Sequence, residues 1–178
     1  MNKEIILDLQ KDYYTELWKH LQSSKLEEAA FAYARPNVDK LGRFTIIEWQ
    51  PVPAEGFVYH TEIGFELTDE MRGIVIKRAH DLDASLVEFH SHKGEWPAEF
   101  SPSDFFGFTE FVPHVWWRLK AKPYFSVVVA NTDFDAFGWI TGPKTPQYLD
   151  ALSVADEIYT PTKLSALTLS DYNYERTL

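Results

Sequence analysis

Residues 86–104 run LVEFHSHKGEWPAEFSPSD, and this stretch says most about the fold and the chemistry of the chain. Residues 86–92 predict a strand that ends in two histidines. Side chains two apart on a strand point to the same side, so His90 and His92 can present two imidazoles to one point. After a short loop, Ser101 is expected to cap a long helix that runs to about Lys120.

Asp104 lies three residues after Ser101, in the first turn of that predicted helix. If the loop folds the helix back over the strand end, His90, His92 and Asp104 form a set of three ligands with one position left for water. Such a set is typical of catalytic zinc, which lowers the pKa of bound water to about 7. The alternative is a capping box, in which the Asp104 carboxylate turns onto the helix start instead of onto a metal.

Hydrophobic periodicity outside this stretch predicts a mixed sheet with helices packed on it, and therefore the α/β or α+β class. The predicted helices are residues 11–22, 69–79 (capped by Asp69) and 149–157, besides the one that begins at Ser101. The predicted strands, besides 86–92, are residues 4–9, 43–52, 62–67, 124–130, 134–140 and 163–169. Residues 27–35 (EEAAFAYAR) stay open, because their alanines favour a helix whereas their short length and Pro36 favour a strand.

The composition describes one soluble domain of 178 residues with a net charge of -10, which argues against binding to nucleic acid or another polyanion. The absence of cysteine excludes disulfides, a thiolate nucleophile and a cysteine-bound zinc. The first residues, MNKEIILDLQKD, do not resemble a signal peptide, and no apolar run approaches the roughly 20 residues that span a bilayer. We therefore expect a cytoplasmic protein without membrane contact.

Several neighbouring residues allow two interpretations each. Glu88 shares the strand face of His90 and is either a partner of the metal ligands or a partly solvated edge residue. Trp96 and Phe100 either wall a substrate groove or simply pack the loop. The other histidines fit no ligand spacing and are predicted to lie at the surface; they are His20, His60, His80 and His114.

The pattern H-x-H-x8-S-x-x-D resembles the signature of the JAMM (MPN-type or JAB) zinc metallopeptidases, which hydrolyse isopeptide or peptide bonds after ubiquitin and ubiquitin-like proteins. That family also has a glutamate at the start of an upstream core strand, with small residues three and seven positions later. Counting from Glu27 gives Ala30 and Ala34, which makes Glu27 the match and Glu28 the fallback.

The resemblance implies a role for each matched residue. His90, His92 and Asp104 would bind zinc (Zn²⁺), Glu27 would act as general base, and Ser101 would donate a hydrogen bond to the oxyanion. It also implies a single JAB/MPN-like domain of cytidine-deaminase-like architecture over residues 1–178. Its catalytic core would be about 1–145, followed by a helix and strand extension over 146–178.

The implied function is cleavage after the C-terminus of a ubiquitin-like protein, in deconjugation or precursor maturation. Bacterial JAB-type proteases of this size accompany ubiquitin-like conjugation systems, including antiphage defence operons, so activating and conjugating enzymes are possible partners. The chain departs from the family at Lys93, where proline is usual, and in having alanine at Ala30 and Ala34, where glycine is commoner. Two alternatives stay open: a scaffold or binding module of the same fold that needs a partner, and a metallohydrolase for a small or sulfur-carrier-type substrate.

Overall fold

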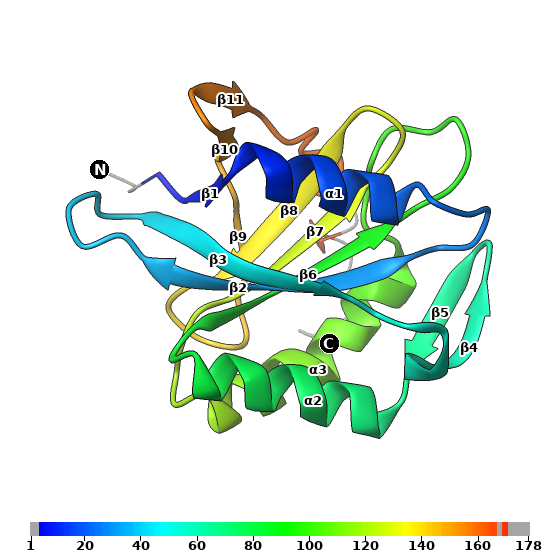
Figure 1. Cartoon of the computed structure of the whole chain (residues 1–178), viewed down its shortest axis with the longest axis horizontal. Coiled ribbons are helices and arrows are strands. Elements are labelled where there is room, and N and C mark those ends of the chain that lie inside the picture. The colour runs from blue at the N-terminus through cyan, green and yellow to red at the C-terminus, as the bar shows by residue number, and fades with distance from the viewer. Residues whose placement is uncertain (1–3, 167–168, 171–178) are drawn as a thin grey trace.

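A computed structural model describes residues 4–166 and 169–170 of the chain. In this part of the chain, a mixed sheet of nine strands has the order β11-β10-β1-β3-β2-β6-β7-β8-β9, and a separate hairpin is formed by β4 and β5 (Figure 1). The sheet strands are β1 (Ile6–Leu9), β2 (Ala29–Pro36), β3 (Arg43–Pro51), β6 (Ser85–Ser91), β7 (Tyr124–Val129), β8 (Phe134–Trp139), β9 (Gln147–Tyr148), β10 (Ala151–Val154) and β11 (Glu157–Tyr159). The hairpin strands are β4 (Phe57–Thr61) and β5 (Gly64–Leu67).

The helices cover both faces of the sheet. In Figure 1, α1 (Lys11–Leu21) lies on one face, and α2 (Asp69–Asp81) and α3 (Pro102–Arg118) lie together on the other. A short 3₁₀ turn, Ala54–Gly56, precedes the hairpin. The fold therefore belongs to the predicted mixed α+β class, with one sheet between helical layers.

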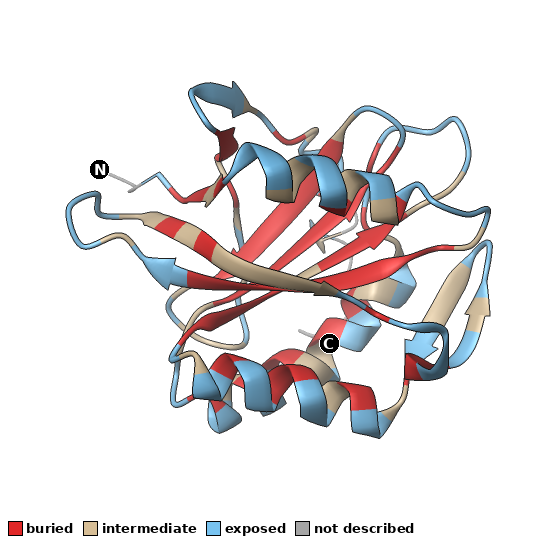
Figure 2. Ribbon diagram, in the orientation of Figure 1, coloured by how far each residue is buried: buried red, intermediate tan, exposed pale blue. Residues whose placement is uncertain are grey.

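Most of the open segment 27–35 lies in strand β2, which begins at Ala29 after Glu27 and Glu28, and the alternation of its side chains explains the two cores. Phe31 and Tyr33 belong to the apolar cluster under α2 and α3. Ala30 and Ala32 belong to the cluster on the opposite face, together with Leu17 of α1. Small residues on one face and aromatic residues on the other suit a strand that is buried on both sides, and Figure 2 shows the central strands as buried.

Helix starts follow the predicted chemistry, with one correction. Ser101 caps α3 as predicted, and it forms a capping box with Asp104. The cap of α2 is Thr68, whose hydroxyl accepts a hydrogen bond from the Met71 amide at 3.0 Å. The prediction of Asp69 was wrong by one residue, because Thr68 has the extended backbone that a cap requires and Asp69 is already helical.

The predictions for the C-terminal part were wrong. Residues 149–157 were expected to be helical, but they include β10, which pairs in parallel with the edge of β1. A left-handed Ala155 then turns the chain into β11. By pairing with β10, the open edge of β1 gains backbone hydrogen-bond partners. These bonds outweigh the helix propensity of the short segment 149–157.

Residues 163–169 were expected to form a last strand. Leu164 and Ser165 instead form a turn, and Ala166 is helical. Residues 167 and 168 lie outside the described residues. Strand β4 was also missed, because its exposed Val58 and Tyr59 give no apolar alternation.

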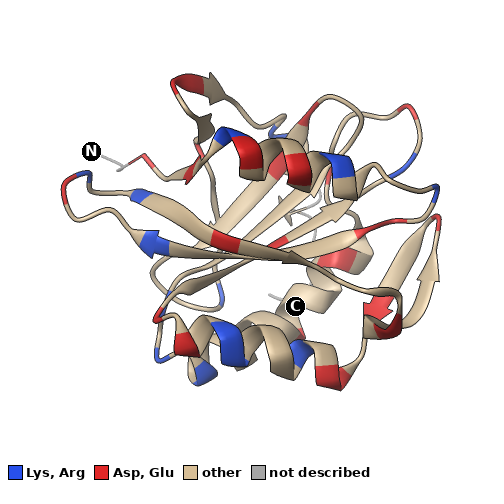
Figure 3. Ribbon diagram, in the orientation of Figure 1, with Lys and Arg blue, Asp and Glu red and all other residues tan. Residues whose placement is uncertain are grey.

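Charged residues lie mostly on the helices and loops around the sheet (Figure 3). Within the described residues, no helix is long and apolar enough to cross a membrane.

Candidate metal centre

The two histidines lie at the carboxyl end of β6, in the middle of the sheet. Strand β6 pairs antiparallel with β2, where His90 faces Ala29, and in parallel with β7. The His92 amide continues this ladder by donating to the Val129 carbonyl at 2.9 Å. The two imidazoles point to the same side, as predicted, with ring centroids 5.0 Å apart.

Asp104 completes the predicted cluster. Its Oδ1 lies 3.3 Å from Nε2 of His90, and its Oδ2 lies 3.3 Å from Nε2 of His92. One ligand atom from each of the three residues lies within 4.8 Å of the others, which is the spacing of a set that can surround one ion. The sequence prediction that these three side chains meet is therefore confirmed.

The two interpretations of Asp104 turn out to be compatible. Its Oδ2 accepts hydrogen bonds from the amide and the hydroxyl of Ser101, at 2.7 and 2.8 Å, which completes the capping box. Its Oδ1 is left facing His90. One carboxylate can cap the helix and face the histidines, because Oδ2 accepts the Ser101 bonds while it lies 3.3 Å from Nε2 of His92, and Oδ1 faces His90.

The electrostatics of the cluster suit a cation. Burial lowers the pKa of His90, but Asp104 and Glu88 outweigh it and raise that pKa to about 10. Burial likewise raises the pKa of Asp104, but His90 and His92 outweigh it and hold that pKa well below its usual range. The pocket thus stabilises positive charge between these groups, either as a proton on His90 or as a metal ion.

The chemistry of the three side chains also fits a metal ion, independently of their pKa values. Both ring nitrogens of the buried His90 face carboxylate oxygens at 3.3 and 3.5 Å but form no hydrogen bond within the described residues, although buried polar atoms are normally paired. Two imidazoles and a carboxylate are ligands that zinc and other transition metals accept, whereas magnesium and calcium prefer oxygen. The residues present therefore fit a zinc-type ion.

Glu88 lies at the ring nitrogen of His90 that faces away from Asp104, and its strand β6 is not at the edge of the sheet. Its Oε1 is 3.5 Å from Nδ1 of His90, and its Oε2 accepts a hydrogen bond from the hydroxyl of the buried Tyr124 at 2.6 Å. A carboxylate at the second nitrogen of a metal-binding imidazole orients the ring and increases its basicity. The structure supports the partner interpretation of Glu88.

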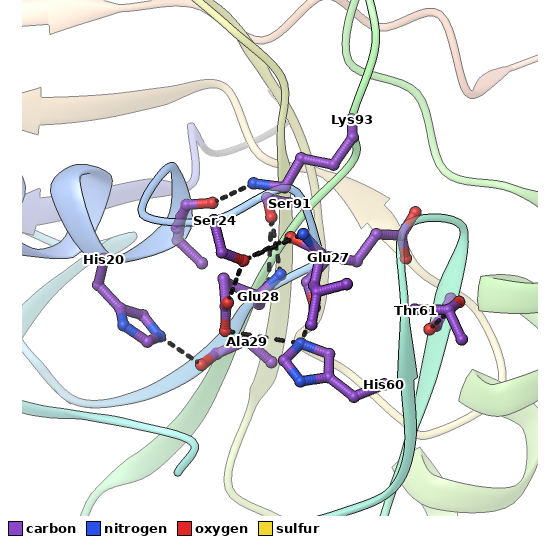
Figure 4. Close-up of polar contacts among 12 residues, drawn as sticks. His20, Ser24, Glu27, Glu28, Ala29, His60, Thr61, Ser91 and Lys93 are labelled. Carbon is purple, nitrogen blue, oxygen red and sulfur yellow. Dashed lines mark hydrogen bonds and ion pairs between the residues drawn. The ribbon is translucent and has the colours of Figure 1, made fainter. Parts of the chain in front are cut away.

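Glu27 and Glu28 immediately precede β2 and point away from one another (Figure 4). Glu27 is 8% exposed and lines a cleft together with His92 and Asp104. Burial raises the pKa of Glu27, partly offset by the nearby histidines. Glu28 is engaged elsewhere, since its Oε1 accepts a hydrogen bond from the Ser24 hydroxyl at 2.5 Å and its Oε2 lies 3.6 Å from Nε2 of His60.

Two histidines predicted to lie at the surface are structural instead. His60 stacks on Phe57 with ring centroids 3.9 Å apart, and its Nε2 lies 2.9 Å from the Glu27 carbonyl oxygen. Nε2 of His20 lies 2.9 Å from the Ala29 carbonyl oxygen (Figure 4). Both rings hold the backbone that carries Glu27. No local sequence pattern predicts the roles of His20 and His60, because each contact joins two elements that are separate in the sequence.

His80 and His114 are exposed, as predicted.

The cleft has a volume of about 760 Å³, and its walls differ from those expected. Phe100 is 1% exposed and packs against His90 with ring centroids 5.8 Å apart, so it belongs to the core. Trp96 is 84% exposed, and within the described residues it is not among those lining the cleft. The walls come from the β4–β5 hairpin and from α3, through residues that include Tyr59, Ile63, Phe65, Phe106 and Phe111.

Lys93, which stands where the JAMM pattern has proline, is one of the residues that line the cleft. Its Nζ donates to the Leu21 carbonyl at 2.7 Å and so binds the last turn of α1, where the helix dipole favours a cation. Burial lowers the pKa of Lys93, and the charges of Glu28 and Glu27 oppose that effect. The lysine therefore connects the loop that follows His92 to the end of α1.

No protein-family model matches the chain, and no curated protein sequence matches it significantly. Among solved structures, it is similar to the solution structure of protein DSY2949 from Desulfitobacterium hafniense. The TM-score is 0.50 at 14% sequence identity, over 85% of this chain and 94% of the other. This likeness concerns the arrangement of helices and strands alone.

Proposed function

We propose that the chain is a zinc-dependent peptidase of the JAMM type, with the JAB/MPN-like architecture that the sequence pattern suggests. One observation carries the proposal. The ligand atoms of His90, His92 and Asp104 converge within 4.8 Å, and the buried Glu27 lines the same cleft. A metal site with a separate carboxylate beside it has the parts needed for hydrolysis.

In this proposal, zinc supplies a Lewis acid that makes water a better nucleophile near neutral pH. Glu27 takes the proton from the attacking water and passes it to the leaving amine. Its burial supports this role, because a raised pKa brings a carboxylate closer to the working pH of a general base. Glu28 is less suited, since its carboxylate already accepts the Ser24 hydroxyl.

Ser101 is proposed to donate a hydrogen bond to the oxyanion that forms on the attacked carbonyl. In the structure its hydroxyl lines the cleft but donates to Asp104 at 2.8 Å. The role therefore requires the hydroxyl to turn from Asp104 toward the substrate. The capping bond from the Asp104 amide to Ser101, at 3.2 Å, would then hold the serine oxygen in place.

The proposed substrate is the flexible C-terminal tail of a ubiquitin-like protein, cleaved in the cytoplasm within a bacterial conjugation system. The rim of the cleft supports a macromolecular substrate, because Tyr59, Ile63 and Phe106 are 49%, 90% and 65% exposed there. Large apolar side chains gathered around a cleft favour contact with another protein.

The small-substrate alternative has its own support in the cleft volume of about 760 Å³, which lies within the range of small-molecule pockets. Rapid hydrolysis of short peptides, unaffected by a folded ubiquitin-like body, would favour it.

The first test is the metal content of the purified chain, measured by mass spectrometry beside the His90→Ala and Asp104→Ala variants. We expect about one zinc per chain, lost or much reduced in both variants. Zinc that is absent, or indifferent to both changes, would sink the proposal. If zinc is present, ubiquitin-like fusions and conjugates are then screened for cleavage, with Glu27→Gln as the inactive control. Cleavage that appears only with an added partner protein would favour the scaffold alternative.

A further inference from the structure

The loop between the proposed ligands His92 and Asp104 is held from outside itself at several points. The Asn131 side-chain amide donates to the Gly94 carbonyl at 3.1 Å. The Ala98 amide donates to the Asp133 carboxylate at 2.8 Å. Both anchors come from the turn between β7 and β8, so that turn fixes the beginning and the middle of the loop.

The end of the same loop is held by residues 160–165, which we call the strap. The Thr162 hydroxyl donates to the Ala98 carbonyl at 2.7 Å. The Ser165 hydroxyl oxygen accepts a hydrogen bond from the Phe100 amide at 2.9 Å. Ser165 and Phe100 are 65 residues apart, and both are buried. The strap belongs to the part of the chain that the sequence pattern placed outside the catalytic core.

A fully buried carboxylate fixes the strap in turn. Oδ2 of Asp135, on β8, accepts hydrogen bonds from the Ser165 hydroxyl at 2.6 Å and from the Ser165 amide at 3.0 Å. Its Oδ1 accepts from the Lys163 amide at 3.1 Å. The Ser165 hydroxyl donates its hydrogen bond to Asp135. The lone pairs of the Ser165 oxygen are therefore free to accept from the Phe100 amide. The order Asp135, Ser165, Phe100 is thus a directed chain of hydrogen bonds.

Phe100 stands at the point where this chain meets the candidate site. Its ring packs against the ring of His90, at 5.8 Å between centroids. The next residue, Ser101, begins the capping box that holds Asp104. A shift of Phe100 would therefore move the ring that packs against His90, and it would also move the start of α3, the helix that carries Asp104.

We propose that Asp135 and Ser165 are positioning residues of the metal centre, acting through Phe100, and that the strap is an integral part of the site. The effect on metal binding rests on the proposed function, whereas the effect on the loop does not. Groups that hydrogen-bond directly to metal ligands typically change metal affinity 10- to 100-fold when they are removed, and Asp135 and Ser165 act one residue further out, so we expect the low end of that range.

The test compares Ser165→Ala with Ser153→Ala in the full chain. Ser153 is also a buried serine, but it lies on β10, which is separated from β6 by β1, β3 and β2. We expect Ser165→Ala to weaken zinc binding about tenfold, measured as Kd by competition with a chelator at a temperature where both variants are folded. The Kd of Ser153→Ala should stay within about twofold of the parent chain.

Amide hydrogen exchange in the metal-free protein, followed by NMR, provides the second readout. The Phe100 amide should exchange faster in Ser165→Ala, while amides of β6 and β7 keep their protection. Thr162→Val removes the other strap bond at a partly exposed position, and it serves if Ser165→Ala does not fold. It should also weaken zinc binding, and it should speed exchange in residues 98–100.

The outcomes separate the two proposals. If the parent chain binds no zinc, the metal proposal fails, and exchange at Phe100 still decides whether the strap positions the loop. If the parent chain binds zinc and both strap variants keep its Kd within about twofold and its Phe100 exchange rate, the positioning role is overturned while the metal site stands.

Discussion

Zinc binding to this chain is expected to release about one proton from His90 at pH 7.5. Without metal, Asp104 and Glu88 outweigh the effect of burial and raise the pKa of His90 to about 10. Only the neutral imidazole can bind zinc, so the ion must displace that proton. With a pKa of about 10, nearly every metal-free chain carries the proton at pH 7.5, and apparent zinc affinity is on the order of 100-fold below its high-pH limit.

The assay is calorimetry of zinc binding at pH 7.5 in two buffers of different ionisation enthalpy, which gives the number of protons released. Kd values at pH 7, 8 and 9, obtained by competition with a chelator, should fall about tenfold per pH unit. Glu88→Gln is the matched variant, because it removes one of the charges that raise the pKa of His90 while keeping the side-chain shape. Its affinity should level off at a lower pH.

A Kd that stays constant from pH 7 to 9, in a protein that loses zinc when His90 is changed to alanine, would refute this reasoning. It would mean that the imidazole is neutral before the metal arrives, and that Asp104 and Glu88 do not govern its proton.

Three further predictions follow from the same contacts. Glu27→Gln should retain zinc and lower the cleavage rate by a factor of about 10² to 10⁴, whereas Glu28→Gln should lower it less, in a single-turnover assay on a cleaved ubiquitin-like substrate. Thr68→Ala should lower the free energy of unfolding by about 1 kcal/mol in urea, and Asp69→Ala by a few tenths, because only Thr68 caps α2; equal effects would contradict the cap assignment. Finally, the metal-free chain should lose stability as pH rises from about 6.5 to 10. Protonated His90 stabilises the fold fully below its unfolded pKa of 6.5, and this contribution is lost as pH rises through its folded pKa of about 10. A thermal midpoint that rises over this range would contradict the raised pKa of His90.

The meeting of His90, His92 and Asp104 could be predicted because it depends on local rules. Strand alternation puts the two histidines on one side, and a Ser-Pro pair starts the helix that carries Asp104. Glu27 and Glu28 can be assigned to different directions once the segment 27–35 is known to lead into strand β2 rather than into a helix. The sequence alone left that point open, because alanine suits both a helix and a strand that packs closely against another layer.

The rest of the site depends on contacts between distant segments. His60 reaches the backbone of Glu27 across 33 residues, and Ser165 reaches Phe100 across 65. Neither position has a residue type or spacing that marks it. The same cause explains the wrong assignment of residues 149–157, where the open edge of β1 selects a strand over the local helical preference.

The pairing of β2 with β6 has a consequence for how the sequence of the β4–β5 hairpin can change. The two strands run antiparallel, so the start of β2 lies beside the end of β6, and the register that sets Ala29 against His90 fixes the spacing between Glu27 and the histidines. Two residues of β4 support the same placement, because Nε2 of His60 lies 2.9 Å from the Glu27 carbonyl oxygen and the Glu27 amide donates to the Thr61 carbonyl at 2.9 Å. The stretch between Glu27 and His90 along the chain carries the β4–β5 hairpin, which forms a wall of the cleft. Changes in the hairpin turn at Ile63 can reshape what the cleft accepts, while the β2–β6 register keeps the distance from the proposed base Glu27 to the proposed metal ligands.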